Sequence, residues 1–271
     1  MKIPRRKFLH LVASTAVLPA VLRVATAQTY PSRPITVVVP FAAGGNNDVN
    51  ARVLAERMRG PLGQPVIIEN VSGADGSIGT GRVARARPDG YTIEMGSTST
   101  NMMNGAIYSL PYDLVNDFAP ISLLFTSPYV LVARKTMPAK DMNELIAWLK
   151  TNPNKASAGI SASSFRLITA FFQKQTGTQF TLVPYRGSAP AMQDLVGGRI
   201  DLLVANLDVL SLPLVRAGTI TAYAAASDTR SALAPDIPTF GEMGLPLSFS
   251  GFGWLFAFPE LNSSLKTEAP S

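Results

Sequence analysis

The stretch VVVPFAAGGNNDVNARVLAERM, residues 37–58, joins the three elements that decide the fold of this chain. An apolar run of β-branched residues ends at Pro40 and predicts a buried strand over residues 35–39. Gly44 and Gly45 follow, and Asn46-Asn47-Asp48 can cap a helix predicted over residues 48–59. A strand that feeds a glycine turn and then a helix aims backbone N–H groups at an anion. The stretch therefore predicts either an anion-binding loop at residues 41–48 or an ordinary tight turn before a capped helix.

The composition bounds the core and removes several kinds of chemistry. With 271 residues, 46% of them hydrophobic, the chain can form two modest domains or one large one. It has no cysteine, and its single histidine, His10, lies in the N-terminal segment. Disulfides, thiolate catalysis, cysteine metal sites and histidine bases or ligands are therefore excluded from the rest of the chain. This composition argues against ordinary hydrolase chemistry.

The N-terminus has the pattern of an export signal. Arg5 and Arg6 resemble the twin-arginine motif, residues 11–22 are apolar, and Ala25-Thr26-Ala27 fits a small-x-small cleavage site. The apolar stretch is short and rich in alanine, so a retained membrane anchor is the weaker alternative. We predict a signal peptide of the twin-arginine type over residues 1–27, cleavage after Ala27, and a mature protein in the periplasm.

The net charge of +6 comes almost entirely from this signal. Five of the 24 basic residues precede Gln28 and none of the 18 acidic residues does, which leaves 19 basic residues against 18 acidic ones. A nearly neutral body has no electrostatic reason to bind polyanions. We therefore expect no nucleic-acid partner and no binding to a membrane surface.

Beyond residue 28, strand-like and helix-like patterns alternate. Predicted strands cover residues 35–39, 66–69, 91–95, 121–124, 129–133, 156–159, 181–184, 201–205 and 220–225. Predicted helices cover residues 48–59, 78–86, 142–151, 164–175, 190–196 and 210–217. Repeated βα units predict an α/β fold of parallel sheets with helices on both faces.

The alternation restarts near residues 124–129, where Ser127-Pro128 separates two predicted strands, and this restart predicts a second sheet. We assign residues 28–125 and 235–271 to a first lobe and residues 126–234 to a second lobe. The apolar run at residues 252–258 can return to the first sheet. Two lobes joined by more than one crossing leave a cleft where the loops after the strands meet.

Polar loops follow the strands in both predicted lobes. They cover residues 41–48, 72–79, 96–101, 161–164 and 184–190, with Asn206 as a sixth position. One such loop alone is more simply explained as helix capping, but their recurrence in both lobes favours a shared polar cleft. Residues 79–84 also match a dinucleotide-binding fingerprint. A loop separates them from the preceding strand and no acidic residue ends the next one, which disfavours NAD binding.

Five segments carry a resemblance to a known family. They read PSRPITVVVPFAAGGNNDVNAR, GADGSIGTGRVARARPDGYT, LPYDLVNDFAPISLL, VPYRGSAPAMQDLVGGRIDLL and ALAPDIPTFGEMGLP, in that order between residues 30 and 259. The chain resembles the periplasmic solute receptors of tripartite tricarboxylate transporters, the Bug/TctC family. The resemblance implies a type II periplasmic-binding-protein fold, in which two α/β lobes close on a small organic carboxylate. We expect a monomer whose partners are this acid and the membrane subunits of the transporter.

The resemblance also implies which residues bind the acid, since the family holds it largely through backbone amides, hydroxyl groups and waters from both lobes. Carried over to this sequence, the ligand-binding positions are Phe41, Gly44, Asp48, Ser97 and Thr98 in the first lobe, and Ser163, Ser164, Tyr185, Gly187, Ala189 and Asn206 in the second. The family pattern includes no catalytic residue and no metal.

The chain departs from the family pattern at three places. Arg166 stands where the family usually has histidine, and it can either supply a charge for a second carboxylate or be a solvated helix residue. Ala205 replaces a frequent aspartate, which argues against an amino-acid ligand. After Pro259 the family continues with helices that pack on the first lobe, whereas this chain reads ELNSSLKTEAPS. We therefore expect the C-terminal part of the first lobe to be truncated.

Two rival readings remain. One is a periplasmic enzyme that uses a serine or a pair of carboxylates, and turnover of the bound compound distinguishes it from a receptor. The other is a truncated paralogue without function.

Overall fold

The opening stretch forms a strand, a glycine turn and a helix. Strand β1 covers Ile35–Val39, as predicted. Helix α2 covers Asn46–Leu62, so it begins two residues earlier and ends three residues later than predicted. In the turn, Gly44 has φ +77°, a left-handed conformation that favours glycine. The first turn of α2 therefore starts directly beside the end of a buried strand.

The computed structural model describes residues 29–259, so the predicted signal peptide and cleavage site lie outside the described residues. From Arg33 onward these residues belong to one compact unit, which contains two connected groups of strands. We call them sheet A and sheet B. None of the helices within residues 29–259 is long and apolar enough to cross a membrane.

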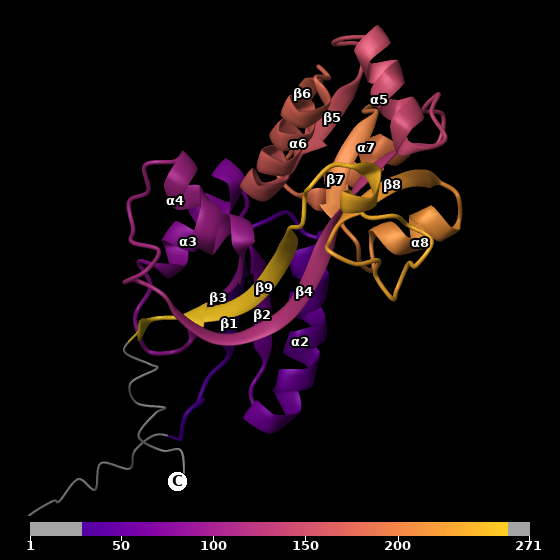
Figure 1. The fold of residues 1–271 in the computed structure, drawn as a ribbon. Coiled ribbons are helices and arrows are strands. Elements are labelled where there is room, and N and C mark those ends of the chain that lie inside the picture. The colour runs from indigo at the N-terminus through magenta and orange to yellow at the C-terminus, as the bar shows by residue number, and fades with distance from the viewer. Residues whose placement is uncertain (1–28, 260–271) are drawn as a thin grey trace, which may run out of the picture. The chain divides into compact units, whose positions relative to one another are not determined.

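Sheet A has the strand order β2-β1-β3-β9-β4 (Figure 1). Its further elements are β2 (Val66–Asn70), η1 (Ala74–Gly76), α3 (Ser77–Val83), β3 (Thr92–Ser97), η2 (Ser99–Met103), α4 (Asn104–Ile107), β4 (Ala119–Arg134) and β9 (Ser250–Ala257). Helix α2 packs on one face through Ala51, while α3 packs on the other through Val83. Strand β1 runs parallel to β2 and β3, whereas β9 runs antiparallel to β3 and β4.

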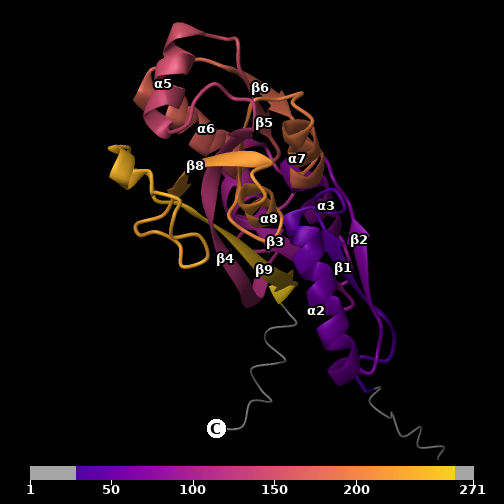
Figure 2. The same cartoon turned by 90° about the vertical axis from the view of Figure 1, so that its right-hand side faces the viewer.

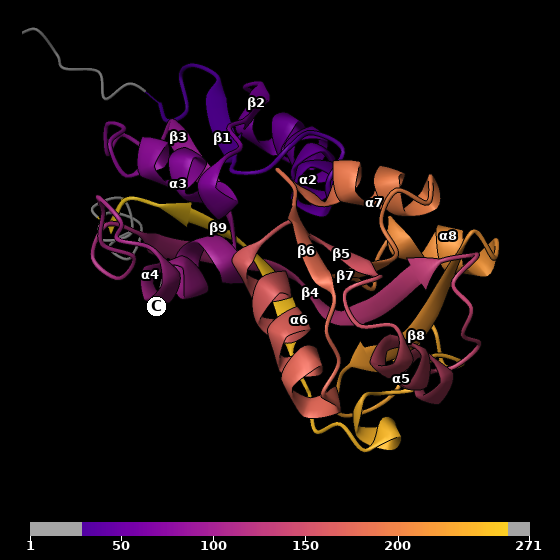
Figure 3. The same ribbon diagram turned by 90° about the horizontal axis from the view of Figure 1, so that it is seen from above.

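Sheet B contains the second half of β4, which lies between β7 and β8, and continues from β7 to β5 and β6. Its elements are α5 (Met142–Thr151), β5 (Ser157–Ile160), α6 (Ser163–Thr176), β6 (Thr181–Pro184), α7 (Ser188–Val196), β7 (Leu202–Asn206), α8 (Ser211–Arg216) and β8 (Ile220–Ala226). Helices α5 and α6 contribute to the core on one face, and α7 and α8 to the core on the other (Figure 3).

The parallel pairing predicted from the βα repeats holds for those repeats but not for every strand. Strands β4, β8 and β9 run antiparallel to their neighbours, and only the βα repeats β1-β2-β3 and β5-β6-β7 are parallel. The order of strands and helices along the chain is the same whether a strand is reached by a crossover helix or by another long connection. The sequence pattern alone therefore does not reveal which strands are antiparallel.

The prediction of two strands around Ser127-Pro128 was wrong, because β4 is one strand of 16 residues. Up to Pro128 it pairs with β9 of sheet A, and from Tyr129 it pairs with β7 and β8 of sheet B. A proline has no N–H to give to a ladder, and here it lies where the strand changes partners. Strands β4 and β9 run side by side (Figure 1, Figure 2).

The chain returns to sheet A at Ser250, where β9 begins. The residues just before it belong with sheet B: Phe240 is buried in its core, and the N–H of Phe249 donates to the carbonyl of Ala226 in β8. The part of residues 235–271 that joins sheet A among the described residues is therefore β9.

The polar loop predicted after β3 is instead helical, with a π-helical turn at Ser99–Met103 followed by α4. Side chains start this turn, because the N–H of Ser97 donates to Thr100 Oγ1 at 2.9 Å and to Asn101 Oδ1 at 3.1 Å. Hydroxyl and amide side chains that bond the backbone locally can begin a helix as well as end one.

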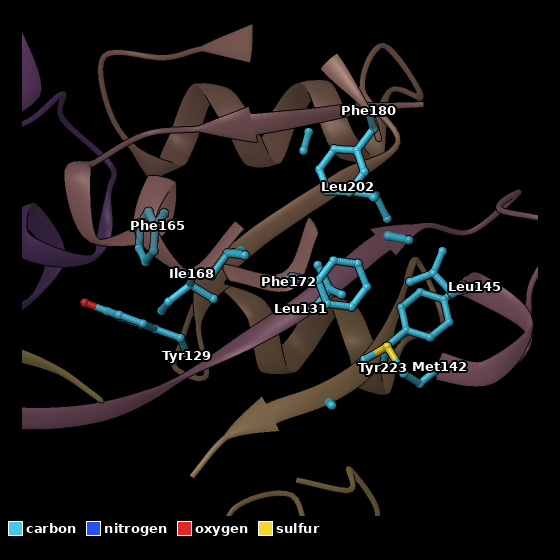
Figure 4. Close-up of a cluster of buried hydrophobic side chains, with 14 of the residues drawn as sticks. Tyr129, Leu131, Met142, Leu145, Phe165, Ile168, Phe172, Phe180, Leu202 and Tyr223 are labelled. Carbon is cyan, nitrogen blue, oxygen red and sulfur yellow. The ribbon is translucent and has the colours of Figure 1, made fainter. Parts of the chain in front are cut away.

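Tyr129 lies at the edge of the largest core cluster, which joins sheet B to α5 and α6. Its ring packs edge-to-face on Phe165, with centroids 5.0 Å apart. In Figure 4 its hydroxyl points away from the other labelled side chains. The ring of Tyr129 is therefore packed in the core of sheet B, while its hydroxyl lies outside that core.

Candidate functional site

A cavity of about 460 Å³ lies where loops of the two sheets meet. Its aromatic side chains are Phe41, Phe125, Tyr129, Phe165 and Phe252. Its polar side chains are Ser97, Ser99, Ser161, Ser164, Ser188, Asn46, Asn47 and Asn206, and Gly45, Ala162 and Gly251 complete the lining. This volume includes space that is open to solvent.

The lining contains no Asp, Glu, Lys or Arg among the described residues. The two cations considered in the sequence lie elsewhere. Arg186 is exposed, and Arg166 faces Tyr108. The hydrogen bond that Tyr108 donates to Asp75, 2.6 Å long, raises the pKa of this tyrosine, and the charge of Arg166 opposes the rise. Any charge on a bound molecule would therefore be met by hydrogen-bond donors and backbone dipoles.

Three helices begin at the cavity wall. The residues that precede their first turns are Gly45 for α2, Ala162 for α6 and Gly187 for α7, and none of the three makes a side-chain capping bond. The starts of α2 and α7 are close together, since a Cβ on Gly45 would lie 3.8 Å from the backbone nitrogen of Ser188. First-turn N–H groups have no partner within their helix, and the positive end of the helix dipole adds to their attraction for anions.

The start of α6 is joined to sheet A by two serines. The N–H of Ser164 donates to Ser99 Oγ at 3.2 Å, and the Ser99 hydroxyl donates to Ser164 Oγ at 2.8 Å. The hydroxyl of Tyr129 also donates to Ser164 Oγ, at 3.1 Å. All three side chains are buried. Burial raises the pKa of Tyr129, and hydrogen bonds oppose this rise, so the phenol stays a neutral donor.

Ser161 was missed when family positions were carried over. It lies in the loop after β5, lines the cavity and is 2% exposed. Its Oγ has no hydrogen-bond partner among the described protein atoms. A buried hydroxyl without a partner loses the full free energy of its hydration, so this atom is suited to bonding a ligand. The signal in the sequence was its place in a polar loop after a strand.

Of the eleven predicted positions, Phe41, Ser97, Ser164 and Asn206 line the cavity. The remaining seven lie outside its lining: Gly44, Asp48, Thr98, Ser163, Tyr185, Gly187 and Ala189. Most of the seven have a structural contact that accounts for their position.

Asp48 holds in place the loop at residues 41–48, which we call the first loop. Its Oδ2 accepts hydrogen bonds from the N–H of Gly44 at 2.8 Å and from Arg52 Nε at 3.0 Å, and its Oδ1 accepts one from Asn70 Nδ2 at 2.9 Å. Burial alone would raise the pKa of Asp48, but the hydrogen bonds from Arg52, Gly44 and Asn70 outweigh it and lower the pKa. This carboxylate therefore shapes the loop and does not face the cavity.

Thr98 and Ser163 make structural hydrogen bonds. Thr98 Oγ1 accepts from the N–H of Phe252 in β9 at 2.9 Å. The hydroxyl of Ser163 donates to Asn104 Oδ1 at 2.8 Å and so joins α6 to α4.

The loop before α7 packs against the first loop. A Cβ on Gly187 would lie 3.1 Å from the nitrogen of Ala42, and the N–H of Ala42 donates to the carbonyl of Arg186 at 3.3 Å. The Cβ of Ala189 lies 3.6 Å from the place that a Cβ on Gly44 would occupy. The hydroxyl of Tyr185 donates to Asp194 Oδ2 at 2.7 Å, and burial followed by this bond raises the pKa of Tyr185 to about 12.

Glu94 lies behind the cavity wall and is fully buried. Its carboxyl group accepts hydrogen bonds from Thr80 Oγ1 at 2.7 Å and from Asn101 Nδ2 at 3.0 Å. Burial raises the pKa of Glu94 to about 7, although these hydrogen bonds oppose the rise. Because Asn101 also accepts from the N–H of Ser97, it connects the buried carboxyl group to a residue of the cavity wall.

Within residues 29–259 no group of three His, Cys, Asp or Glu side chains is placed to hold a metal ion. The donors at the cavity are hydroxyls, amides and backbone N–H groups, which suit an oxygen-rich anion.

Comparison with known proteins agrees with this geometry. The model of the tripartite tricarboxylate transporter family receptor matches residues 50–259. Protein BugT of Bordetella pertussis is 39% identical over 225 residues, which is 82% of this chain and 69% of BugT.

Two solved structures show the same fold. MatC from Rhodopseudomonas palustris, with bound malate, is 35% identical with a TM-score of 0.81, and the match covers 88% of this chain and 85% of MatC. The Rpa4515 protein of R. palustris, with adipate, is 34% identical with a TM-score of 0.82, and the match covers 88% of this chain and 82% of that one. The described chain therefore has the two-sheet fold of the periplasmic binding proteins, as predicted.

Proposed function

Because the chain belongs to the tripartite tricarboxylate transporter receptor family, we propose that it binds a small organic carboxylate in this cavity and delivers it to the membrane subunits of such a transporter. The observation that carries the proposal is the meeting of three helix N-termini, those of α2, α6 and α7, at a cavity without a charged side chain. The unpartnered hydroxyl of Ser161 supports it independently.

The affinity comes from neutral donors fixed in advance by the fold. A hydrogen bond to a charged group contributes about 1.5–3 kcal/mol, so a few backbone N–H groups and hydroxyls can hold a carboxylate. Their positions are set by elements of both sheets, so little freedom is lost when the acid binds. Malate and adipate, bound by two of the similar proteins, belong to the same chemical class.

The proposal includes export to the periplasm by the twin-arginine signal over residues 1–27, which resembles the signals of exported proteins. Mass spectrometry of the periplasmic fraction is expected to find a mature protein that begins at Gln28. A protein that remains in the cytoplasm, or that keeps Met1, would contradict export.

The proposal also states that the bound acid is released unchanged. The mature sequence has no histidine, and Ser99 and Ser164 of the cavity are hydrogen-bonded to hydroxyls and a backbone N–H rather than to a general base. NMR of the acid after long incubation with the protein is expected to show no product. Formation of a product would favour the serine or carboxylate enzyme instead.

We further propose a monomer that does not bind nucleic acid, since the body without its signal is nearly neutral. Light scattering of the protein purified from the periplasm, alone and with DNA, tests both points. A mass of two chains would contradict the proposed monomer. A complex with DNA would contradict the proposed lack of nucleic-acid binding.

The direct test is a thermal-shift screen of organic acids on the protein purified from the periplasm, followed by calorimetry. A ligand at a hundred times its Kd stabilises a protein by about 2.7 kcal/mol, which raises the Tm of a domain this size by roughly 5–10 °C. Ser161→Ala is expected to weaken the best acid by about tenfold or more, the effect of one hydrogen bond to a charged group. If no carboxylate shifts the Tm, the proposal is wrong.

A further inference from the structure

We propose that the cavity selects acids with one carboxylate and an apolar ring, and that Ser99 excludes a second carboxylate by occupying the N-terminus of α6. This inference rests on the proposed function and names the class of acid that the site takes. It follows from a difference between the two ends of the cavity and from the nature of its walls.

The carboxylate end lies where α2 and α7 begin. The backbone there approaches closely, since a Cβ on Gly45 would lie 3.8 Å from the nitrogen of Ser188 and 4.0 Å from that of Ala189. Neither helix has a side-chain cap, so first-turn N–H groups of both helices remain to bond an anion. Two helix dipoles directed at one point make this the favoured position for a negative charge.

The other end, at α6, is already occupied by the protein. Ser99 Oγ accepts the hydrogen bond of the Ser164 N–H at 3.2 Å, and its own proton goes to Ser164 Oγ at 2.8 Å. Tyr129 donates to the same Ser164 oxygen at 3.1 Å. The side chain of Ser99 is therefore where an anionic oxygen would have to lie to accept from the first turn of α6. A second carboxylate at the start of α6 would find the N–H of Ser164 already bonded by Ser99.

Among the described residues of the cavity lining, no cation is present to replace the N–H of Ser164 as a partner for a second carboxylate. Arg166 belongs to α6 but lies outside the cavity lining, where its charge lowers the pKa of Tyr108, and Arg186 is exposed. An ionised group moved into such a site without a partner is strongly disfavoured. The cavity lining also includes the rings of Phe41, Phe125 and Phe252. These rings suit an apolar body, because aromatic surfaces pack on one another with a preference beyond the burial of area.

Calorimetry at pH 7.5 tests the inference with four probes: benzoate, 3-phenylpropionate, adipate and malate. The protein purified from the periplasm is expected to bind one of the ring acids at least about a hundredfold more tightly than either dicarboxylate. If a dicarboxylate binds as tightly as the ring acids, the inference is overturned and the proposed function stands. If none of these acids binds and the wider screen of carboxylates is also empty, the proposed function fails.

Ser99→Ala tests the role of Ser99. Loss of the hydroxyl leaves the Ser164 N–H available to a ligand, so the affinity for adipate relative to benzoate is expected to rise about tenfold. Thr151→Ala is the control, since the Thr151 hydroxyl donates only to the carbonyls of Ala147 and Trp148 in its own helix, α5, and lies outside the cavity lining. Its ratio of affinities is expected to stay within threefold of wild type. An unchanged ratio in a folded Ser99→Ala protein would overturn the assignment, and if that variant fails to fold, Ser99→Gly provides the same test.

Discussion

The hydroxyl of Ser99 accepts the hydrogen bond of the Ser164 N–H across the meeting of the two sheets, with the two atoms 3.2 Å apart and the residues 65 positions apart in the chain. The first turn of α6 is thus capped by a side chain from the other sheet. Capping normally uses a residue next to the helix. Here it joins the helical turn after β3 to α6.

Two further contacts join the sheets near the cavity. Ser163 donates to Asn104, and the N–H of Ala42 donates to the carbonyl of Arg186. An opening of the cavity has to break such hydrogen bonds, each of which contributes about 0.5–1.5 kcal/mol net. A ligand that adds bonds to both sheets would hold them together.

The approach of a ligand to the backbone at Gly45 is tested by Gly45→Ala. The φ of −77° and ψ of 170° at Gly45 allow an alanine, but its Cβ would lie between the starts of α2 and α7. We expect affinity for the best acid to fall at least tenfold while the protein still folds. Gly241→Ala is the control, because its Cβ would meet only Thr239 Oγ1 at 3.6 Å. Equal affinities of the two variants would place the acid elsewhere.

Asp48→Asn tests the support of the first loop. The replacement removes the charge that the N–H of Gly44 and Asn70 bond in a buried place, so we expect a loss of about 1–3 kcal/mol in unfolding free energy, together with weaker ligand binding. Arg52→Gln is expected to cost less than about 1 kcal/mol, since the Arg52 side chain is 55% exposed. Urea unfolding and calorimetry measure both effects. Similar losses in both variants would mean that the ion pair, not the buried bonds, supports the loop.

From the lowered pKa of Asp48 we also predict how the free energy of unfolding falls at acid pH. Because its pKa in the folded protein is below the value of 3.8 for a free side chain, its contribution is present above that value and is lost as the pH falls through the lower folded value. In Asp48→Asn the free energy of unfolding is expected to depend less on pH at acid pH than in the wild type.

Tyr185→Phe tests whether the Tyr185 hydroxyl binds the ligand, as the family resemblance implies, or only bonds Asp194, as in the structure. The Tyr185 hydroxyl donates to Asp194 and lies outside the lining of the cavity. We expect affinity within about twofold of wild type and a loss of roughly 0.5–1.5 kcal/mol in unfolding free energy. A tenfold loss of affinity in calorimetry would mean that this hydroxyl contacts the ligand after all.

Glu94 predicts a dependence of stability on pH in the neutral range. Burial raises its pKa from 4.5 to about 7, so between these values the folded state holds more protons than the unfolded state and stability falls as the pH rises. The loss approaches roughly 3 kcal/mol above pH 7, at about 1.4 kcal/mol for each unit of pKa.

Urea midpoints at pH 5 and pH 8 measure this loss, and Glu94→Gln is expected to remove most of it. Asp208, whose pKa burial raises to about 6, acts in the same direction and leaves a smaller residual dependence. A wild-type midpoint that does not fall between pH 5 and pH 8 would contradict the prediction for Glu94.

The absence of charged side chains from the described cavity lining predicts a weak effect of salt. Bonds from buried neutral donors are poorly screened, so raising the salt from 0.05 to 0.5 M, about a threefold change in screening length, is expected to alter Kd less than threefold. A steep salt dependence, or loss of binding in Arg186→Ala, would instead indicate an ion pair with the ligand.

Elements that depend on local pattern were predictable from the sequence. The bounds of β1, α5 and β6 are those predicted. In α5 the reason is visible, since the Asp141 side chain accepts from the N–H of Glu144 at 2.9 Å and fixes the first turn. The motif segments carried the family in the same way, because their order and spacing are written in the chain.

The direction of the polar side chains was decided only by the tertiary structure. Asp48 and Thr98 stand in loops after strands, as expected of binding residues, yet they accept hydrogen bonds from Asn70 and from the N–H of Phe252, which are 22 and 154 positions away in the chain. A hydroxyl or carboxylate bonds whichever donor or acceptor the fold brings within about 3 Å, and that partner is often far away in the sequence.

The sequence by itself determined the βα repeats, the glycine turn that leads into a helix at Asn46, and the family, because these follow from periodicity, turn residues and ordered segments. The tertiary structure decided that β4 is continuous through Pro128, that Ser99 caps α6 and that Ser161 lines the cavity. The physical reason is that each of these depends on pairing between segments dozens of residues apart. Such pairing is fixed by packing of the whole fold and leaves no local pattern in the chain.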